Sequence, residues 1–300
     1  MSFRIGVDGG GTKTECILLD GNGIVAASHL APGCNPSLVG AERARAILIS
    51  AIQALVAGPS PPIVDRVLLC MAGSQSFWRE TAAGLTGYGR IETASDSLPV
   101  LELATGGDPG LALHAGTGSF VTARAPDGSV HYAGGLGWRF GDPGSGYDLG
   151  CRGIARALLE LQGWAPRTAL AVELSRHTGL PDYTANSRFF YRDADANAAI
   201  AAFAPCVIEL AGQDCPGTRQ IIADSLAGFA GPIDAVLRQL FPGATMASPV
   251  HGGVSGALLN RQPCRSALHA LAAAKSWPVQ LQPVTDRPIE GVRRLVHKLA

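Results

Sequence analysis

Two short glycine-rich segments of this chain carry the residue types that bind phosphate. Residues 8–14 read DGGGTKT and residues 115–119 read AGTGS. Glycine lets backbone N–H groups approach an anion closely. The first segment is not a P-loop, because Lys13 follows Thr12 instead of a glycine, and it is not a dinucleotide loop, because Thr14 stands where the last glycine belongs. We therefore expect two phosphate-binding turns, each joining the strands of a hairpin.

Two such hairpins could hold the β- and γ-phosphates of ATP with backbone N–H groups and threonine hydroxyls. Lys13 either pairs with phosphate or is simply solvated. Asp8 ends an apolar strand, so its carboxylate can reach a Mg²⁺ ion beside the triphosphate, and the alternative is an ordinary turn aspartate. The candidate phosphate contacts are Gly10, Gly11, Thr12, Lys13, Gly116, Thr117 and Gly118.

The elements that must position these loops follow one plan twice. Residues 3–8 predict a buried strand, and two further strands follow the first loop around an Asp-Gly-Asn-Gly turn. Apolar spacing then predicts a helix over 41–57, and strands and helices alternate onward. The opening pattern recurs from Pro109, which predicts an internally duplicated α/β chain. We expect one domain over 1–108 and a second over 109–286.

The second half carries additional helices. Residues 145–162 and 194–240 are mainly helical by pattern, which predicts a helical insert. Residues 247–260 predict a strand, a glycine loop and a helix, and a final helix spans 288–299. This last segment, 287–300, is expected to pack against the first domain.

Composition narrows the class of protein. Lys+Arg and Asp+Glu both number 24, which gives no basic stripe and argues against nucleic-acid binding. Apolar segments fall short of the roughly 20 residues that a membrane span needs. Seven cysteines form no CxxC pair, and the amino-terminal residues do not resemble a secretion signal. A cytoplasmic globular enzyme is expected, and a homodimer is left open.

Several motifs, taken in order, resemble a known family. They are DGGGTKT (8–14), ASDS (94–97), AGTGS (115–119), GLGWRFGDPGSGYDLG (135–150) and HGGVSGALL (251–259). Nearly the whole chain resembles the N-acetylglucosamine kinase and BadF/BcrA-type ATPase group of the actin/hexokinase/Hsp70-like ATPases. This resemblance implies two ribonuclease H-like (actin-like ATPase) domains, with mixed five-stranded sheets flanked by helices and a helical insert in the second.

The resemblance also implies roles for individual residues. Asp96 is expected to accept the proton of the attacking sugar hydroxyl, although an aspartate before a helix can instead be a cap. Asn35, Gly137, Trp138 and Asp142 match segments that contact the amino sugar, against alternatives of an Asx turn, a core indole and a turn aspartate. Gly252 and Gly253 are expected near the adenosine. Pro143 replaces the glutamate common in this segment, which leaves the sugar preference open.

The expected activity is transfer of phosphate from Mg-ATP to the 6-hydroxyl of N-acetylglucosamine or glucosamine. One alternative is an activator ATPase of the BadF/BcrA type, which needs iron–sulfur cysteines near the second loop, where Cys151 has no CxxC companion. Another is a sugar-sensing regulator, which would need a DNA-binding segment before Asp8.

Overall fold

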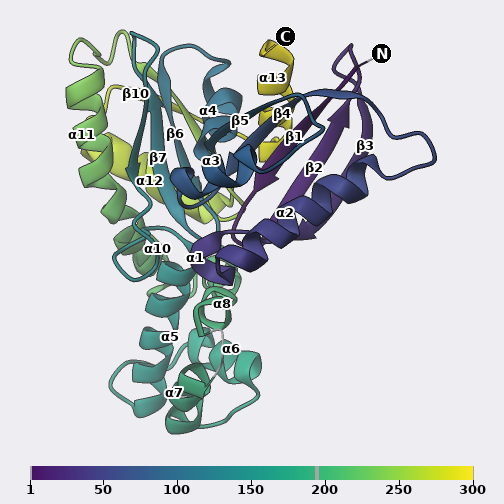
Figure 1. Cartoon of the computed structure of the whole chain (residues 1–300). Helices are drawn as coiled ribbons and strands as arrows, with labels where there is room; N and C mark the ends of the chain where they lie inside the picture. The colour runs from purple at the N-terminus through teal and green to yellow at the C-terminus, as the bar shows by residue number, and fades with distance from the viewer. Residues whose placement is uncertain (1, 193–195, 300) are drawn as a thin grey trace. The chain divides into compact units, whose positions relative to one another are not determined.

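The computed structural model describes residues 2–192 and 196–299, which form two compact units (Figure 1). One unit comprises the chain up to Gly107 together with the segment from Asp286 onward, and the other comprises Asp108–Thr285. Each unit contains one five-stranded sheet.

The first sheet has the strand order β3-β2-β1-β4-β5. Its first three strands are antiparallel neighbours, whereas β4 and β5 run parallel to β1. The parallel strands β1, β4 and β5 therefore end at one edge of the sheet, where the loops after them meet. The strands are β1 (Phe3–Gly9), β2 (Lys13–Leu19), β3 (Val25–Pro32), β4 (Val64–Met71) and β5 (Arg90–Ser95).

Helices cover both faces of this sheet because its central strand alternates between two cores. Val67, Leu69 and Met71 of β4 pack with helices α2 and α3, whereas Leu68 and Cys70 pack with α13. Successive side chains of a strand point to opposite faces, so an apolar run without alternation is buried on both sides. The helices are α1 (Pro36–Val39), α2 (Ala41–Val56), α3 (Gln75–Ala83), α4 (Ser97–Thr105) and α13 (Pro288–Lys298).

Two glycines let α13 pack closely in the first unit. A Cβ at Gly291 would lie 2.2 Å from the backbone oxygen of Pro99 in α4, and a Cβ at Gly6 of β1 would lie 2.7 Å from Val292. The carboxyl-terminal helix thus contacts both the first strand and the helix that follows Asp96.

The second sheet repeats the first, with the order β10-β9-β6-β7-β8. Here β6, β7 and β8 are antiparallel neighbours, whereas β9 pairs parallel with β6 and β10 pairs parallel with β9. The predicted duplication and fold class are therefore confirmed by topology. The strands are β6 (Gly110–Ala115), β7 (Ser119–Arg124), β8 (Val130–Gly134), β9 (Val250–Ser255) and β10 (Val279–Pro283).

Helices inserted between β8 and β9 include a group, α5 to α8, drawn at the bottom of Figure 1, that shares a separate core with α9 and the start of α10. Two of these helices, α6 and α7, fall in residues for which the sequence predicted no helix. The helices of the second unit are α5 (Gly146–Gln162), α6 (Ala169–Thr178), α7 (Tyr183–Arg192), α8 (Ala196–Ala201), α9 (Ala204–Gly212), α10 (Thr218–Leu226), α11 (Ala230–Leu240) and α12 (Gln262–Ala274).

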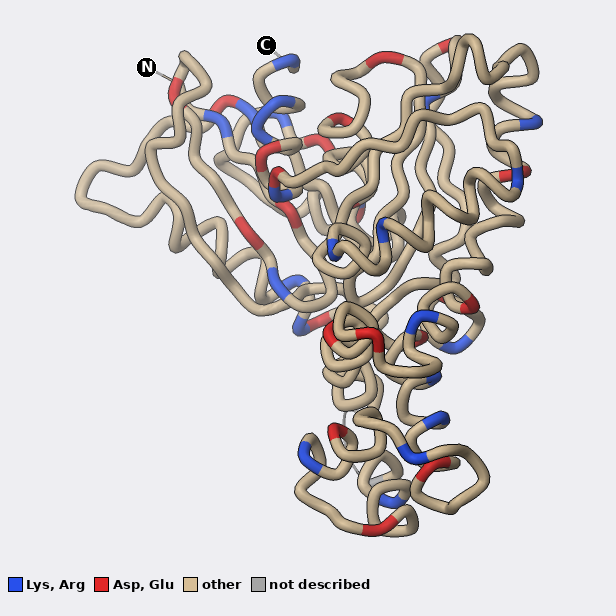
Figure 2. Tube along the Cα trace, turned by 180° about the vertical axis from the view of Figure 1, so that it is seen from behind, with Lys and Arg blue, Asp and Glu red and all other residues tan. Residues whose placement is uncertain are grey.

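The helical run Thr218–Leu240 is the one stretch of the described chain that is long and apolar enough to cross a membrane. It comprises α10, a short 3₁₀ turn and α11, and its Ile222, Phe229 and Ile233 belong to the core around the second sheet. Burial against that sheet accounts for its apolar composition. Charged residues of both signs are interspersed along the trace (Figure 2).

Candidate functional site

The first glycine loop is held in place by a second segment of the same unit. The loop closes on itself through a hydrogen bond from the Gly10 N–H to the Lys13 carbonyl, at 2.9 Å. The Gly33 and Cys34 N–H groups donate to the carbonyls of Thr12 and Gly10, both at 3.1 Å. A Cβ at Gly33 would lie 2.0 Å from the Gly11 oxygen, so only glycine fits there. Gly33 was not among the predicted site residues, although its place in a Pro-Gly pair was a signal.

Two carboxylates gather at the edge of the first sheet where its parallel strands end. Asp8 of β1 pairs in register with Cys70 of β4, which pairs with Ala94 of β5, two residues before Asp96. Asp8 is 9% exposed. Burial, and next the negative charge of Asp96, raise the pKa of Asp8 to about 7, although Lys13 acts in the opposite direction.

Asp96 stands at the N-cap position of α4, but its side chain makes no capping hydrogen bond. Ser95 Oγ instead accepts from the Ser97 N–H at 3.2 Å and donates to Asp96 Oδ1, also at 3.2 Å. Burial raises the pKa of Asp96, and the hydrogen bond from Ser95 partly offsets this effect. A serine side chain thus satisfies the helix end, and the carboxylate of Asp96 is available for another role.

Asn35 forms the Asx turn that was the simpler alternative for it, and this turn caps α1. Its Oδ1 accepts from the Ser37 N–H at 3.0 Å at the start of α1. A Cβ at Gly73, which follows β4, would lie 2.8 Å from the same Oδ1. Asn35 therefore lies beside the loop after β4, and the cap leaves its Nδ2 hydrogens as the donors that a ligand could use.

Lys13 is ion-paired with a neighbour on its own strand. Its Nζ lies 3.1 Å from Glu15 Oε2, and Glu15 Oε1 lies 2.7 Å from a guanidinium nitrogen of Arg287. The Lys13 ammonium is thus paired with a carboxylate of its own strand and is not simply solvated.

The second glycine loop is organised by Asp142. The Gly116 N–H donates to Gly118 O at 2.8 Å, and a Cβ at Gly118 would lie 3.0 Å from Asp142 Oδ2. Asp142 Oδ1 accepts from the Gly137 N–H at 3.1 Å. Burial raises the pKa of Asp142, whereas hydrogen bonds from the Gly137 and Ser119 backbones oppose that rise. One buried carboxylate thus joins the phosphate-loop candidate to the loop containing Gly137.

Trp138 is not a core indole. Its side chain is 36% exposed, and its ring centroid lies 5.2 Å from that of Tyr147 on α5. The guanidinium of Arg139 lies 5.0 Å from the Trp138 ring centroid. An exposed indole held between these neighbours can stack on an apolar face of a ligand.

The prediction of a loop at Gly252 and Gly253 is wrong, because both residues lie inside β9. They pair with Leu111 and Ala112 of β6, and the helix expected directly afterwards begins only at Gln262. Glycine within a central strand is compatible with pairing on both sides. The turn comes instead at Gly256, where φ is +102° and a Cβ would lie 2.1 Å from Ala115 O.

A histidine that was not among the predicted site residues connects the second loop to this turn. His114 is the next-to-last residue of β6, and it pairs in register with Ser255 of β9, which directly precedes Gly256. Its Nδ1 lies 3.3 Å from Ser255 Oγ, and its ring is stacked on Phe120. Burial lowers the pKa of His114 to about 4, so its imidazole is neutral at physiological pH.

The chemistry of the first-unit carboxylates fits a divalent cation. Among the described residues no three His, Cys, Asp or Glu side chains gather into a metal site of their own. A magnesium ion bound with nucleotide needs one or two carboxylates, however, and takes its remaining oxygens from phosphate and water. Asp8, with a raised pKa and Asp96 nearby, is a carboxylate that a cation would stabilise.

Comparison with known proteins adds to this geometry. The model of the BadF/BadG/BcrA/BcrD ATPase family matches residues 5–262. The N-acetyl-D-glucosamine kinase of Dictyostelium discoideum is 28% identical over 182 residues, which cover 55% of this chain and 57% of that protein. The chain therefore matches just over half the length of that relative.

Two further proteins match larger parts of the chain. The N-acetylmuramic acid/N-acetylglucosamine kinase of Clostridium acetobutylicum is 25% identical over 211 residues, covering 67% of this chain and 68% of that protein. A solved structure from Chromobacterium violaceum, provisionally described as an N-acetylglucosamine kinase, has a TM-score of 0.77 at 26% identity and covers 99% of both chains.

Proposed function

The chain belongs to the BadF/BadG/BcrA/BcrD ATPase family, and from this premise we propose that it is an amino-sugar kinase. It transfers the terminal phosphate of ATP to the 6-hydroxyl of N-acetylglucosamine or glucosamine. The observation that carries the proposal is the carboxylate of Asp96, which stands at a helix start without capping it. The names of the relatives support the same substrate class.

In the first unit, Asp96 accepts the proton of the sugar hydroxyl. Burial raises the pKa of Asp96, and this makes the carboxylate a stronger base than one in water. Asn35 donates to the sugar through Nδ2. The backbone N–H groups of the loop 10–13 bind phosphate, and Asp8 would hold Mg²⁺. When bound, Mg²⁺ supplies neutralisation of the phosphate charge.

In the second unit, the loop 116–118 binds phosphate and is kept in position by Asp142. Gly137 and Trp138 contribute to sugar recognition, because Asp142 fixes the backbone at Gly137 and the indole of Trp138 is exposed. Gly252 and Gly253 support the adenosine site indirectly, as the strand residues that precede the turn at Gly256. We also propose a cytoplasmic location, where ATP and free sugars are present.

An activator ATPase that delivers electrons is the second candidate, and the cysteines give it little support. Cys16, Cys34, Cys70, Cys215 and Cys264 are buried, whereas Cys151 is exposed on α5. Iron–sulfur clusters are held by sets of cysteine thiolates, and the exposed Cys151 has no CxxC companion in the sequence. We expect purified protein to be colourless and to turn over ATP without iron.

The test is coupled ADP release against a panel of sugars. The panel contains N-acetylglucosamine, glucosamine, N-acetylmannosamine, N-acetylmuramic acid and glucose. ADP release that requires an amino sugar is expected, and mass spectrometry would locate the phosphate on the 6-hydroxyl. Equal ADP release with and without sugar would refute the kinase, and preference for glucose would refute the amino-sugar class.

A further inference from the structure

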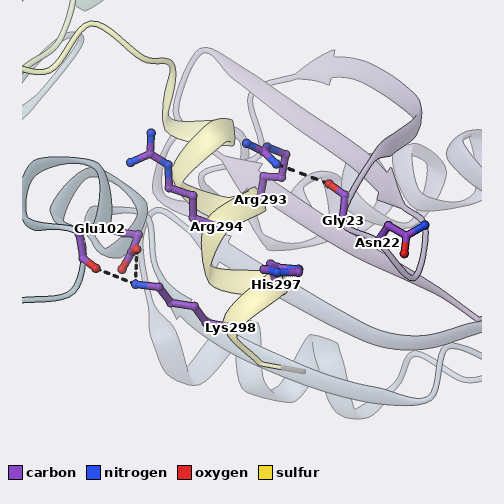
Figure 3. A pocket seen from close by; sticks show the side chains of 8 residues that line it. Asn22, Gly23, Glu102, Arg293, Arg294, His297 and Lys298 are labelled. Atoms are coloured by element: carbon purple, nitrogen blue, oxygen red, sulfur yellow. Dashed lines mark hydrogen bonds and ion pairs between the residues drawn. The ribbon is translucent and has the colours of Figure 1, made fainter.

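A pocket of about 340 Å³ lies in the first unit beside α13 (Figure 3). Its walls are the last turns of α13, the end of α4 at Glu102 and Gly106, and the β2–β3 turn at Asn22 and Gly23. None of these residues belongs to the candidate functional site. The pocket therefore has no role in the proposed reaction.

Four basic side chains of one helix line the pocket. Arg293, Arg294, His297 and Lys298 are spaced i, i+1, i+4 and i+5, which places them on one face of α13. A basic helix face is usually just solvated. Here the β2–β3 turn forms a wall on one side of the face, because an added Cβ at Gly23 would lie 3.0 Å from His297 Nδ1, while Arg294, His297 and Lys298 stay exposed to solvent.

Glu102, the one carboxylate among the residues that line this pocket, is withdrawn from its surface. The Glu102 side chain is 2% exposed, and its Oε1 lies 2.6 Å from Lys298 Nζ. The Lys298 side chain is 50% exposed. Lys298 also donates to Gly106 O at 2.7 Å and so neutralises the carbonyl end of α4. This pair supports the wall of the pocket and leaves no carboxylate facing a ligand.

Both arginines form ion pairs with exposed carboxylates, and Arg293 also donates to the Gly23 carbonyl at 3.5 Å. Arg293 Nε lies 2.8 Å from Glu290, and an Arg294 nitrogen lies 3.0 Å from Asp286, with 38% and 52% of the two acidic side chains exposed. Exposed ion pairs contribute little to stability, because water and salt screen them. An anion can therefore share or replace these partners at little cost.

We propose that this pocket binds the phosphate group of a small molecule. Arginine and lysine are donors only, so the pocket selects a ligand rich in acceptors, and a guanidinium pairs with two phosphate oxygens at once. A metal cation is disfavoured, because the lining residues include three cationic side chains and the one lining carboxylate, Glu102, is paired with Lys298. The volume lies at the small end of ligand pockets, which suits inorganic phosphate or a sugar phosphate and is tight for a nucleotide.

The pocket also lies at the far end of the helix that carries the candidate base. Glu102 and Gly106 are at the end of α4, and Asp96 is its N-cap. The binding proposal stands on the pocket alone and does not depend on the proposed reaction.

The test is calorimetry on the full chain with two probes, inorganic phosphate and glucose 6-phosphate. The pocket variant is Arg293→Gln with Arg294→Gln. Its matched control is Arg43→Gln with Arg79→Gln, which removes the same charge from two exposed positions on α2 and α3. We expect the pocket variant to bind both probes at least about tenfold more weakly, and the control to bind as wild type. Tighter binding of glucose 6-phosphate would indicate a sugar phosphate, and equal binding would indicate the phosphate group alone.

A second variant separates loss of the pocket from loss of the fold. Asn22→Glu adds a carboxylate at an exposed turn position of the pocket and keeps both arginines. This variant should bind both probes more weakly than wild type, while its melting temperature stays near that of wild type. Binding that is equal in wild type, pocket variant and Asn22→Glu, or no binding to wild type at millimolar phosphate, would overturn the proposal.

Discussion

Asp8 lies in β1 and Asp96 directly follows β5, yet the charge of Asp96 affects the protonation of Asp8. Burial comes first, and the charge of Asp96 second, among the causes that raise the pKa of Asp8 from 3.8 to about 7. Two carboxylates held together without a cation cost folding free energy. The same arrangement is favourable once a divalent cation and nucleotide are bound. The two carboxylates thus lower the stability of the ligand-free protein, and ligand binding restores it.

The contribution of Asp8 to stability without ligands should therefore fall as pH rises. The folded state keeps a proton on Asp8 up to about pH 7, whereas the unfolded chain loses it near 3.8. The folded state thus binds more protons between these values, and the free energy of unfolding decreases through that window. Asp8→Asn should remove this dependence and be more stable than wild type at pH 8, by on the order of 2 kcal/mol.

The measurement is urea unfolding of both proteins at pH 5 and pH 8 with a chelator present. The difference in free energy of unfolding between wild type and Asp8→Asn should be larger at pH 8 than at pH 5. A difference that stays constant with pH would show that Asp8 is not the group responsible.

Asp96→Asn should abolish sugar phosphorylation while nucleotide affinity stays nearly unchanged. A positioned base contributes about 10²–10⁴ in rate, and the amide cannot accept the hydroxyl proton. Turnover and nucleotide binding should be measured on the same preparation. Asp65→Asn is the matched control, because Asp65 is an exposed aspartate on β4 of the same unit. Turnover of Asp96→Asn within about tenfold of wild type would remove Asp96 from the role of base.

Gly33→Ala should weaken ATP binding by more than about tenfold. The new Cβ would lie 2.0 Å from Gly11 O and would push the first loop out of position. Gly21→Ala is the control, since a Cβ at Gly21 meets nothing within 4 Å in the same unit. Nucleotide affinity by calorimetry distinguishes the two. If both alanine variants bind ATP as wild type does, the loop 10–13 is not a nucleotide site.

The sheets could be predicted from the sequence, because their signals are local. The turn at Asp20 shows this, since its Oδ1 accepts from two following N–H groups, at Asn22 and Ile24, as an Asp-Gly-Asn-Gly sequence suggests. The β9 glycines were harder, because Gly252 and Gly253 look like a loop until their partners on β6 and β10 are known.

The connections that complete the site lie outside any local pattern. His114 and Ser255 are 141 positions apart and meet only because β6 and β9 pair in register. Gly33 supports the first loop from beyond β3, and nothing in DGGGTKT itself indicates that partner. Loops could therefore be recognised from the sequence, but the residues that hold them could not.

His114 should make the protein sensitive to acid. Burial lowers its pKa from 6.5 to about 4, so the unfolded chain takes up a proton near pH 6.5 that the folded state refuses until about pH 4. The unfolded state thus binds more protons in this window, and the free energy of unfolding decreases as pH falls through it. His114→Gln keeps a polar group toward Ser255. Between pH 7 and pH 4.5 its free energy of unfolding should fall by on the order of 2 kcal/mol less than that of wild type.

His269→Gln is the matched control, because His269 is exposed on α12. Comparing variants at each pH cancels the opposite contribution of Asp8, which all three proteins share. Urea unfolding at half-unit steps of pH provides the data. Parallel curves for wild type and His114→Gln would mean that His114 is protonated in the folded state as readily as in the unfolded chain.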